Sequence, residues 1–330
     1  MSEYRCNLLV VIVNYKTPDL VCKSLETLVK ELEVNSGRAI IVDNNSMDDS
    51  ASILSDYIKD NNLQHIVTLV LSDCNGGFAY GNNLAIRDVI QSNNPPEFVY
   101  FLNPDAWVLD DAISALLTFM QNKPKIGIVG GGLEDPDGSR QNSSFRFHNW
   151  LTEIDRGFNL SFISKLLKPW LSSNTTLNVP SKTDWVAGAS MLIRTEVFND
   201  IGLLDESYFM YYEEMDFCLQ AARSGWECWY VPDSRVVHYV GQSSGITDNK
   251  VQAKRRPTYW FESRRRFFLK NYGVFRAMLA DTFWLFGFGT WRLRNFLQHQ
   301  NHNFPPYFLF DSFMNSVFVK GFKKRPVKND

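Results

Sequence analysis

The chain has 330 residues, of which 45% are hydrophobic and 21% charged, an ordinary composition for a folded globular protein. Charge is uneven: residues 251–330 hold 15 Lys and Arg against 4 Asp and Glu, a net of +11, and the rest of the chain carries −13. Five cysteines without C-x-x-C spacing argue against a disulfide framework or zinc site and fit a reducing compartment. With no secretory signal and no apolar run of about 18 residues, we expect a cytoplasmic protein without a bilayer-spanning helix.

Apolar runs and helical patterns alternate through the first half of the chain. Strands are predicted at residues 8–13, 39–42, 66–71 and 98–102. A helix is predicted to open at Thr17-Pro18-Asp19, and a later one to span residues 213–224 before Gly225. This order predicts an open α/β sheet with its ligands at the carboxyl ends of the strands.

Two other stretches differ in character. Residues 135–182 are predicted to be loop-rich, with turn signals at 136–138 and 172–174, and form either a mobile cover or a plain surface connection. The last 80 residues hold 20 of the 47 aromatic residues, mixed with Arg and Lys clusters.

Two acidic segments are candidates for chemistry. Asn103-Pro104-Asp105 follows an apolar strand, and its carboxylate suits a hard cation such as Mg²⁺ or Mn²⁺; the alternative is a solvated turn. Glu213, Glu214 and Asp216 stand at a predicted helix start, where the helix dipole favours ionised carboxylates that can act as general bases. Glu213 and Asp216 share a helix face, so one acid can deprotonate an acceptor while another orients it.

Two further segments are candidates for binding a metal or a ligand. His238 follows an apolar strand and is either a metal ligand or a structural histidine. Residues 75–83, with three glycines and three asparagines, allow close backbone approach to a ligand or form an ordinary turn before a helix. They lack the G-x-G-x-x-G spacing of a dinucleotide fingerprint, which counts against a Rossmann oxidoreductase.

Taken together and in this order, the segments resemble family-2 glycosyltransferases with the GT-A fold, most closely the rhamnosyltransferase branch. The matching pieces run from residue 8 to about 245 and include Val11-Ile12-Val13-Asn14-Tyr15, Ile41-Val42-Asp43-Asn44-Asn45-Ser46, residues 75–83, Leu102-Asn103-Pro104-Asp105-Ala106 and Trp185-Val186-Ala187-Gly188-Ala189. The resemblance implies a Rossmann-like mixed sheet flanked by helices as a catalytic domain at 1–250, followed by a helical aromatic and basic region at 251–330.

The resemblance also implies roles for individual residues. Glu214 matches the second acid of the family's E-D pair, the usual catalytic base, with Glu213 and Asp216 as further candidates. Asp105 corresponds to the metal ligand of the family's D-x-D, in which the first Asp is Asn here, and His238 matches a further metal ligand. The nucleotide-sugar pocket is assigned to Asn14, Tyr15, Thr17, Asp43, Asn45, Asn75, Gly76, Asn82 and Asn103, and the acceptor site to Trp185, Gly188 and Tyr211.

The implied reaction is a single in-line displacement with inversion, aided by Mg²⁺ or Mn²⁺. The resemblance favours dTDP-rhamnose as the donor, with UDP-galactose-type donors next, and a carbohydrate or lipid-linked glycan as the acceptor in cell-surface polysaccharide assembly. A catalytically inactive binding protein on the same fold is the other alternative.

The basic, aromatic C-terminal region has two interpretations. Its composition is typical of a surface that docks on an anionic membrane, here the inner face of the cytoplasmic membrane. Alternatively, its aromatic residues form a helical core against the catalytic domain and its charges are solvated. No recognised module supports nucleic-acid binding.

Overall fold

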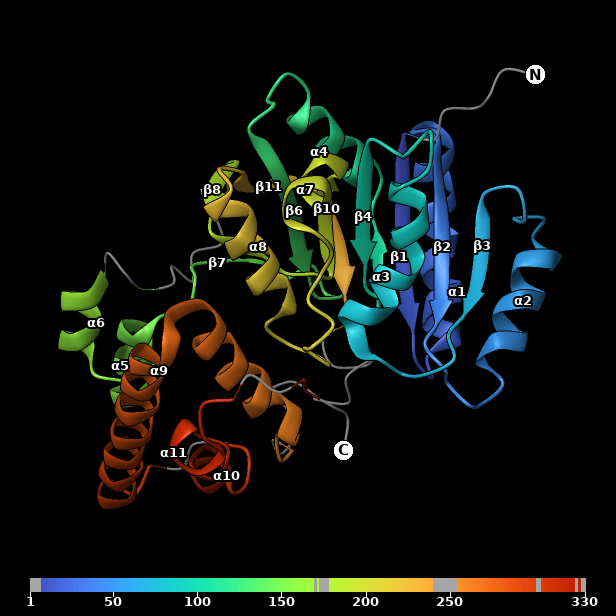
Figure 1. Ribbon diagram of the computed structural model, residues 1–330. Coiled ribbons are helices and arrows are strands. Elements are labelled where there is room, and N and C mark those ends of the chain that lie inside the picture. The colour runs from blue at the N-terminus through green and yellow to red at the C-terminus, as the bar shows by residue number, and fades with distance from the viewer. Residues whose placement is uncertain are drawn as a thin grey trace.

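The computed structural model describes residues 7–168, 171, 178–239, 254–300, 304–323 and 326–327. These residues form a nine-stranded mixed sheet in the order β3-β2-β1-β4-β10-β6-β11-β5, with β8 paired to β11 (Figure 1). Its strands are β1 (Leu8–Asn14), β2 (Gly37–Asp43), β3 (Val67–Leu71), β4 (Phe98–Leu102), β5 (Ala106–Val108), β6 (Ile126–Glu134), β8 (Ser181–Thr183), β10 (Ser190–Arg194) and β11 (Glu227–His238). A separate small sheet pairs β7 (Ser144–Phe145) with β9 (Trp185–Val186).

The four strands predicted from apolar runs are confirmed as β1 to β4. They pair in parallel, with β1 between β2 and β4, so their carboxyl ends meet at one edge of the sheet. All five residues of β4 are buried, as a strand covered on both faces requires. Strand β10 then runs antiparallel between β4 and β6, which makes the sheet mixed.

Helices cover both faces of the sheet. The helices of the described residues are α1 (Pro18–Val34), α2 (Ser50–Asp60), α3 (Gly77–Ile90), α4 (Ala112–Met120), α5 (Trp150–Phe158), α6 (Ser161–Leu167), α7 (Thr195–Ile201), α8 (Glu213–Arg223), α9 (Thr258–Leu297), α10 (Phe308–Met314) and α11 (Val317–Lys320), and only some of them cover the sheet. One core joins α1, α2 and α4 to the sheet, and a second joins α3, α7 and α8 to the opposite face. The layered α/β architecture predicted from the strand–helix order is therefore confirmed.

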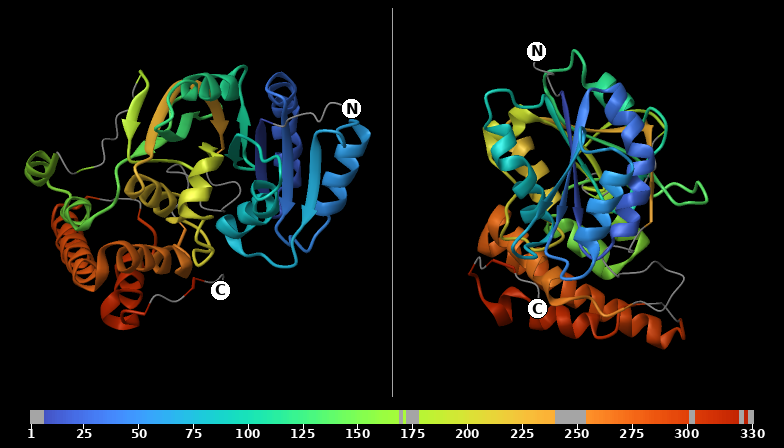
Figure 2. Two further views of the ribbon diagram at one scale, coloured as in Figure 1. Left: turned by 45° about the horizontal axis from the view of Figure 1, so that its top comes forward. Right: turned by 90° about the vertical axis from the view of Figure 1, so that its right-hand side faces the viewer.

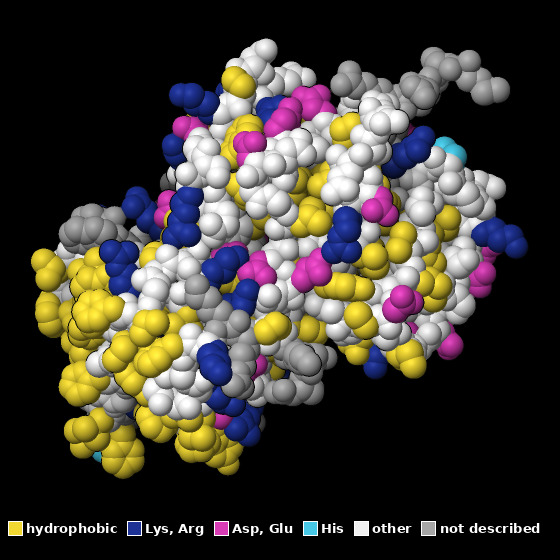
Figure 3. Space-filling view, in the orientation of Figure 1, with side chains coloured by type: hydrophobic (Ala, Val, Ile, Leu, Met, Phe, Trp, Pro, Cys, Tyr) yellow, Lys and Arg dark blue, Asp and Glu magenta, His cyan; other side chains and the backbone are white. Residues whose placement is uncertain are grey.

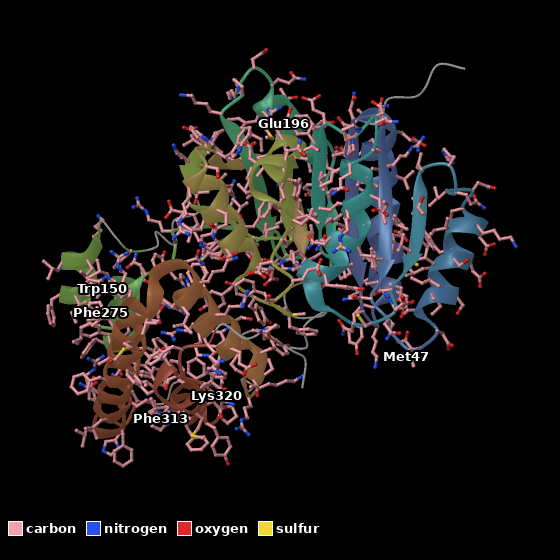
Figure 4. All side chains as sticks on the ribbon, in the orientation of Figure 1. Met47, Trp150, Glu196, Phe275, Phe313 and Lys320 are labelled. Atoms are coloured by element: carbon pink, nitrogen blue, oxygen red, sulfur yellow. The ribbon has the colours of Figure 1, made fainter. Side chains whose placement is uncertain are left out.

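The C-terminal helices gather at one end of the sheet (Figures 1 and 2). Met47, which follows β2, and Glu196, which follows the antiparallel β10, mark the two ends of the sheet, and the C-terminal helices lie at the Met47 end (Figure 4). This is the end at which the parallel strands finish. Helix α9 bends at Gly273, whose φ of 79° interrupts the helix and lets its two halves run in different directions.

Residues 135–182 contain more regular structure than the sequence predicts, because they include α5 and α6. Helix α5 starts with a capping box: the Asn149 side chain accepts from the backbone N–H of Thr152, whose hydroxyl accepts from the Asn149 N–H. Gly157 of α5 meets Gly287 of α9, where a Cβ would come within 3.0 Å of neighbouring backbone, so the two helices pack closely. The turn signal at 172–174 lies outside the described residues. The predicted turn at 136–138 is present, and what the prediction of a loop-rich segment missed is α5 and α6.

A buried charge cluster joins α5, both halves of α9 and α11. The Arg264 guanidinium donates to Glu153, at 2.7 Å, and to Asp281, while the second oxygen of Asp281 accepts from the backbone N–H of Val317 at 2.7 Å. Arg264, Glu153 and Asp281 are all less than 10% exposed. The cluster therefore ties α9 and α11 to α5 through paired charges.

We expect Arg264→Met to lower the free energy of unfolding by about 3–5 kcal/mol, because it leaves two buried carboxylates without their cation. Lys30→Ala is the control, since Lys30 forms an ion pair with Asp110 in which both side chains are mostly exposed. Urea denaturation should separate the two variants clearly. Unfolding of Arg264→Met at the wild-type urea concentration would show that the cluster does not stabilise the fold.

In the part of the chain that the structure describes, no helix has the length and apolarity needed to cross a bilayer.

Candidate active site

Polar side chains at the ends of β1 and β2 bind one another closely. Asn14 donates to the Asp43 carboxylate at 2.7 Å, and the Ser46 hydroxyl donates to the same oxygen at 2.6 Å. The Asn14 side-chain oxygen accepts from the backbone and hydroxyl of Thr17, which stands before α1. Asn14 and Asp43, both buried, thus fix the turns around this strand edge.

Two predicted nucleotide contacts lie on the accessible side of these turns. Tyr15 is 36% exposed, with the Lys16 ammonium 5.4 Å from its ring centre. Asn45 has a left-handed φ of 57° and donates to the backbone oxygen of Asp73 at 3.3 Å. The exposed Tyr15 ring therefore lies next to the end of β1.

The glycine-rich segment, residues 75–83, contacts both the turn that follows β2 and the loop before α8. Asn75 accepts from the Asn44 side chain at 3.0 Å and from the Gly77 backbone, which fixes the start of α3. Gly77 has a φ of 86°, and a Cβ there would lie 1.8 Å from the backbone oxygen of Phe209. At Gly76 a Cβ would clash with the Tyr80 ring. Close approach of protein backbone is therefore what demands glycine at position 77.

Gly77→Ala should cost more stability than Gly225→Ala. Both glycines have positive φ, at 86° and 93°, so each alanine incurs about 1–2 kcal/mol of backbone strain. Only at Gly77 does the added methyl meet backbone, and relieving that overlap should add about 1–3 kcal/mol. Chemical denaturation measures the difference. Equal losses in both variants would contradict the proposed contact with Phe209.

Asn82 does not extend this cradle. It is 1% exposed, and its amide donates to the backbone oxygen of Phe78 at 2.9 Å, one turn earlier in α3. The prediction that Asn82 binds a nucleotide therefore disagrees with its position. An asparagine pattern in sequence cannot tell a side chain that faces a ligand from one that bonds within its own helix.

Asp105 and His238 come together from distant parts of the sequence. Asp105 is fully buried just before β5, and its Oδ1 lies 3.5 Å from Nε2 of His238 at the end of β11. Antiparallel pairing of β5 with β11 sets this proximity. The Asn103 amide lies 3.4 Å from the same ring nitrogen. A buried carboxylate next to an imidazole is an arrangement that suits a divalent cation.

Gln141 holds the other side of the His238 ring. Its side-chain oxygen lies 3.2 Å from Nδ1, and its amide donates to the backbone oxygen of His238 at 2.7 Å and to Asp135 at 2.8 Å. Since the Gln141 oxygen can only accept, it favours a proton on Nδ1 and leaves Nε2 with its lone pair toward Asp105. This support was not predicted from the sequence.

Glu213 and Glu214 begin α8 in a buried setting. Burial raises the pKa of Glu213 well above its ordinary value, and the neighbouring charge of Glu214 adds to this. Burial also raises the pKa of Glu214, opposed by its own backbone N–H and that of Gly188. In both acids the effect of burial outweighs the opposing backbone hydrogen bonds, so the net shift of each pKa is upward. Carboxyls with raised pKa values are suited to proton transfer near neutral pH.

The loop before these acids is strained and held by α9. Tyr211 and Tyr212 have φ values of 68° and 72°, which tyrosine rarely adopts. The Tyr211 ring stacks on Tyr259 with centres 6.1 Å apart, and the Ser263 hydroxyl donates to the backbone oxygen of Met210 at 2.9 Å. The first half of α9 thus fixes the loop that presents Glu213.

Asp216 has a different role from the one predicted. Its oxygens accept from Lys270 and Asn271 of α9, each at 2.6 Å, and from the Tyr208 hydroxyl at 3.3 Å. Asp216 is 2% exposed, so it joins α8 to α9 rather than facing an acceptor. Helical spacing identified the face that Asp216 shares with Glu213 but could not reveal that α9 covers it.

A short turn at residues 187–190 links the two halves of the site. The backbone N–H of Asn103 donates to the carbonyl of Ala189 at 3.3 Å. A Cβ on Gly188 would lie 3.0 Å from the Phe78 ring and 3.8 Å from Cβ of Glu214. Trp185, just before the turn, stacks on Phe145 and donates to the backbone oxygen of Arg146. The predicted acceptor residue Gly188 therefore lies between the Asn103 strand end and Glu214.

A cavity of about 380 Å³ opens at the start of α9, beside the loop that precedes α8 and contains Tyr211. Its lining includes Arg255, Arg256 and Tyr259, whose ring stacks on Tyr211. Glu214, Asp105 and His238 are not part of this lining. The cavity thus borders the loop that carries the acids without containing them.

Comparison with known proteins shows which family this chain resembles in sequence. Residues 9–201 match the model of glycosyl transferase family 2. The chain is 28% identical to an N-acetylglucosaminyl-diphospho-decaprenol L-rhamnosyltransferase of Mycobacterium tuberculosis (strain CDC 1551 / Oshkosh) over 62% of its own length and 63% of the relative's. It is also 28% identical to rhamnosyltransferase WbbL of Escherichia coli (strain K12), over 70% of this chain and 83% of that protein.

The fold comparison agrees. The structure of a mannosyltransferase from Pyrobaculum calidifontis in complex with GDP-Man and Mn²⁺ superposes with a TM-score of 0.55 at 14% identity, covering 97% of this chain and 83% of that one. This likeness supports the GT-A fold that the sequence motifs implied. Since the family model spans more than half of the chain, the protein belongs to glycosyl transferase family 2.

Proposed function

We propose that this protein is an inverting glycosyltransferase that moves a hexosyl group from a nucleotide-sugar donor to an acceptor hydroxyl. The observation that carries the proposal is the buried pair Glu213 and Glu214 at the start of α8, joined through residues 187–190 to the strand end that holds Asp105 and His238. Membership of glycosyl transferase family 2 supports it. Residues 1–250 would form the catalytic domain, and the helices of 251–330 would hold its acidic loop.

In the proposed reaction, Glu214 accepts the proton of the acceptor hydroxyl as its oxygen bonds to the anomeric carbon. The bond between that carbon and the diphosphate oxygen breaks on the opposite side, and the nucleoside diphosphate leaves with the bonding electrons. A buried carboxylate with a raised pKa can take this proton without solvent. Tyr211 and Gly188 would border the acceptor, and Tyr15 and Asp43 the nucleotide.

Asp105 and His238 fit a divalent cation such as Mg²⁺ or Mn²⁺. They offer one buried carboxylate oxygen and one imidazole nitrogen on neighbouring strands. Among the described residues no group of three or more His, Cys, Asp or Glu side chains gathers to hold a metal, so donor phosphates and water would complete the coordination. A bound cation would supply positive charge for the leaving diphosphate.

For the donor we propose dTDP-rhamnose, and for the acceptor a lipid-linked glycan in cell-surface polysaccharide assembly at the inner face of the cytoplasmic membrane. The names of the two rhamnosyltransferase relatives support the sugar, and the diphospho-decaprenol in one of those names supports the acceptor class. The chain spans 63% of the length of the relative from Mycobacterium tuberculosis.

A panel of nucleotide sugars, screened by thermal shift and then by transfer, tests the proposal. With Mn²⁺ present, we expect dTDP-rhamnose to stabilise the protein more than UDP-galactose, UDP-glucose or GDP-mannose, and to be consumed when a lipid-linked acceptor is added. Preference for a UDP sugar would correct the proposed identity of the donor and leave the proposed glycosyl transfer standing. Absence of both binding and turnover with every donor would overturn the proposed function.

A further inference from the structure

The second half of α9 carries an apolar stripe on its outward face. Phe275, Leu279, Phe286, Leu293 and Leu297 follow one another at intervals of four, seven, seven and four residues. At about 100° per residue they fall within an arc of about 40°, along about 33 Å of helix. Except for the half-buried Leu279, each exposes between 59% and 73% of its surface.

The opposite face of the same helix segment is already used for packing. Ala277, Ala280 and Trp284 are buried, and Phe288 and Trp291 stack on one another within the local aromatic core. A surface helix normally buries one apolar face and gives the other to charged residues. This segment instead has apolar side chains on both faces, so packing against the protein does not account for the outer stripe.

Neighbouring helices extend this surface. Phe162 of α6, Phe310 and Phe313 of α10, and Phe318 of α11 are between 47% and 66% exposed. Figure 3 shows hydrophobic side chains gathered in the lower-left lobe, over α6, α9 and α10. Figure 4 places the labelled Phe275 and Phe313 in this same lobe. We call the α9 stripe and these four phenylalanines the aromatic face. A large exposed apolar surface of this kind marks an interaction site.

Basic residues border the aromatic face. Arg276 and Arg292 are exposed and project on opposite sides of the stripe, because their positions lie roughly 100° either way around the helix from Phe275. Lys320 ends α11, in the same lobe (Figure 4). Of the cations in the last 80 residues, Arg264, Arg266 and Lys270 pair with acids within the protein, whereas Arg276, Arg292 and Lys320 are exposed.

We propose that the aromatic face docks into the headgroup region of an anionic phospholipid bilayer, with α9 lying in the plane of the membrane. An apolar stripe with an exposed arginine on either side is the pattern of an interfacial helix: the phenylalanines enter the acyl boundary and the cations meet lipid phosphates. A second copy of the chain is the other possible occupant of this face, and the vesicle experiment below distinguishes the two.

Docking in this way also orients the catalytic groups. The first half of α9, before the bend at Gly273, bonds to Asp216 of α8 through Lys270 and Asn271. The helix that rests on the bilayer therefore also holds the helix that begins with Glu213 and Glu214. This inference rests on the proposed function in one respect, because docking would bring the active site to a lipid-linked acceptor. Binding of the aromatic face to a bilayer does not itself require sugar transfer.

The test uses vesicles of phosphatidylglycerol and phosphatidylcholine, sedimented with the full chain. We expect binding that weakens as salt rises. The variant Phe275→Ser with Phe286→Ser and Leu293→Ser should lose at least tenfold in vesicle partitioning. The matched control is Val34→Ser with Ile53→Ser, which removes exposed apolar residues on α1 and α2 and should bind as the wild type does. Circular dichroism and thermal unfolding establish that each variant folds.

Unchanged partitioning of the folded stripe variant would overturn the proposal. So would vesicle-independent dimerisation that the stripe variant abolishes, because the occupant would then be a second copy. The Glu214→Gln variant separates this inference from the proposed function, since it should bind vesicles normally. If the wild type binds vesicles through the stripe yet transfers no sugar from any donor, the docking surface stands and the proposed function fails.

Discussion

Glu214→Gln is expected to lower the rate of sugar transfer by roughly 10²–10⁴-fold, the usual contribution of a positioned general base. Glutamine keeps the size of the side chain but cannot accept the acceptor proton. Binding of the nucleotide-sugar donor should survive, because Asn14, Asp43 and Tyr15 lie at the ends of the first strands. Transfer kinetics and donor titration by calorimetry measure the two effects separately.

The control for this variant is its neighbour. Glu213→Gln removes a carboxyl of the same helix turn that is more deeply buried, and we expect a smaller loss of transfer. Neither variant should be less stable than the wild type at pH 7. A buried carboxyl whose pKa is raised costs stability as the pH rises through that pKa, and a neutral amide avoids the cost. Normal turnover by Glu214→Gln would refute its assignment as the base.

The pH profile gives a second view of the same group. Because burial raises the pKa of Glu214, transfer should fall on the acid side at a pH above the ordinary value of a Glu carboxyl.

Removal of divalent cations is expected to abolish transfer, and Mn²⁺ or Mg²⁺ to restore it. Asp105→Asn and His238→Ala should each reduce transfer by at least about 100-fold, because the charge that develops on the leaving diphosphate loses its counter-charge. Titration with Mn²⁺ in the presence of nucleoside diphosphate, followed by electron paramagnetic resonance, should show weaker metal binding in both variants.

His65→Ala is the matched control for His238→Ala. The His65 ring is exposed on the loop before β3, where its Nδ1 lies 3.0 Å from the backbone oxygen of Asn62. We expect no change in metal binding or transfer. Full activity of the wild type in excess chelator would show that neither Asp105 nor His238 acts through a metal.

The parts of the site that lie within single segments were predictable from the sequence. The apolar run of β4 fixes a strand whose end carries Asn103-Pro104-Asp105, and three acids near position 213 mark a helix start. Such features depend on residues that are close together in the chain. The spacing of apolar residues and the residue types that favour turns and helix starts therefore reveal them. The aromatic C-terminal region likewise was predicted to form either a core or a membrane surface, and its helices present both an inner packed face and an outer exposed one.

The parts that depend on contacts between distant segments were not predictable. Asp216 accepts hydrogen bonds from Lys270 and Asn271, which lie more than fifty residues later in the chain. The Gln141 side chain contacts the ring of His238, 97 residues away in sequence. The burial that raises the pKa of Glu213 likewise appears only in the folded chain. A single sequence contains no signal for these pairings, since each of the residue types involved is also common on surfaces.

The most direct test of the account is a crystal of the protein soaked with Mn²⁺ and dTDP, examined by anomalous scattering. We predict one manganese peak in direct contact with Asp105 and His238, with the diphosphate bound to it and its free end directed toward Glu214. A manganese ion or nucleotide bound away from these three residues would contradict the claim that they serve one reaction.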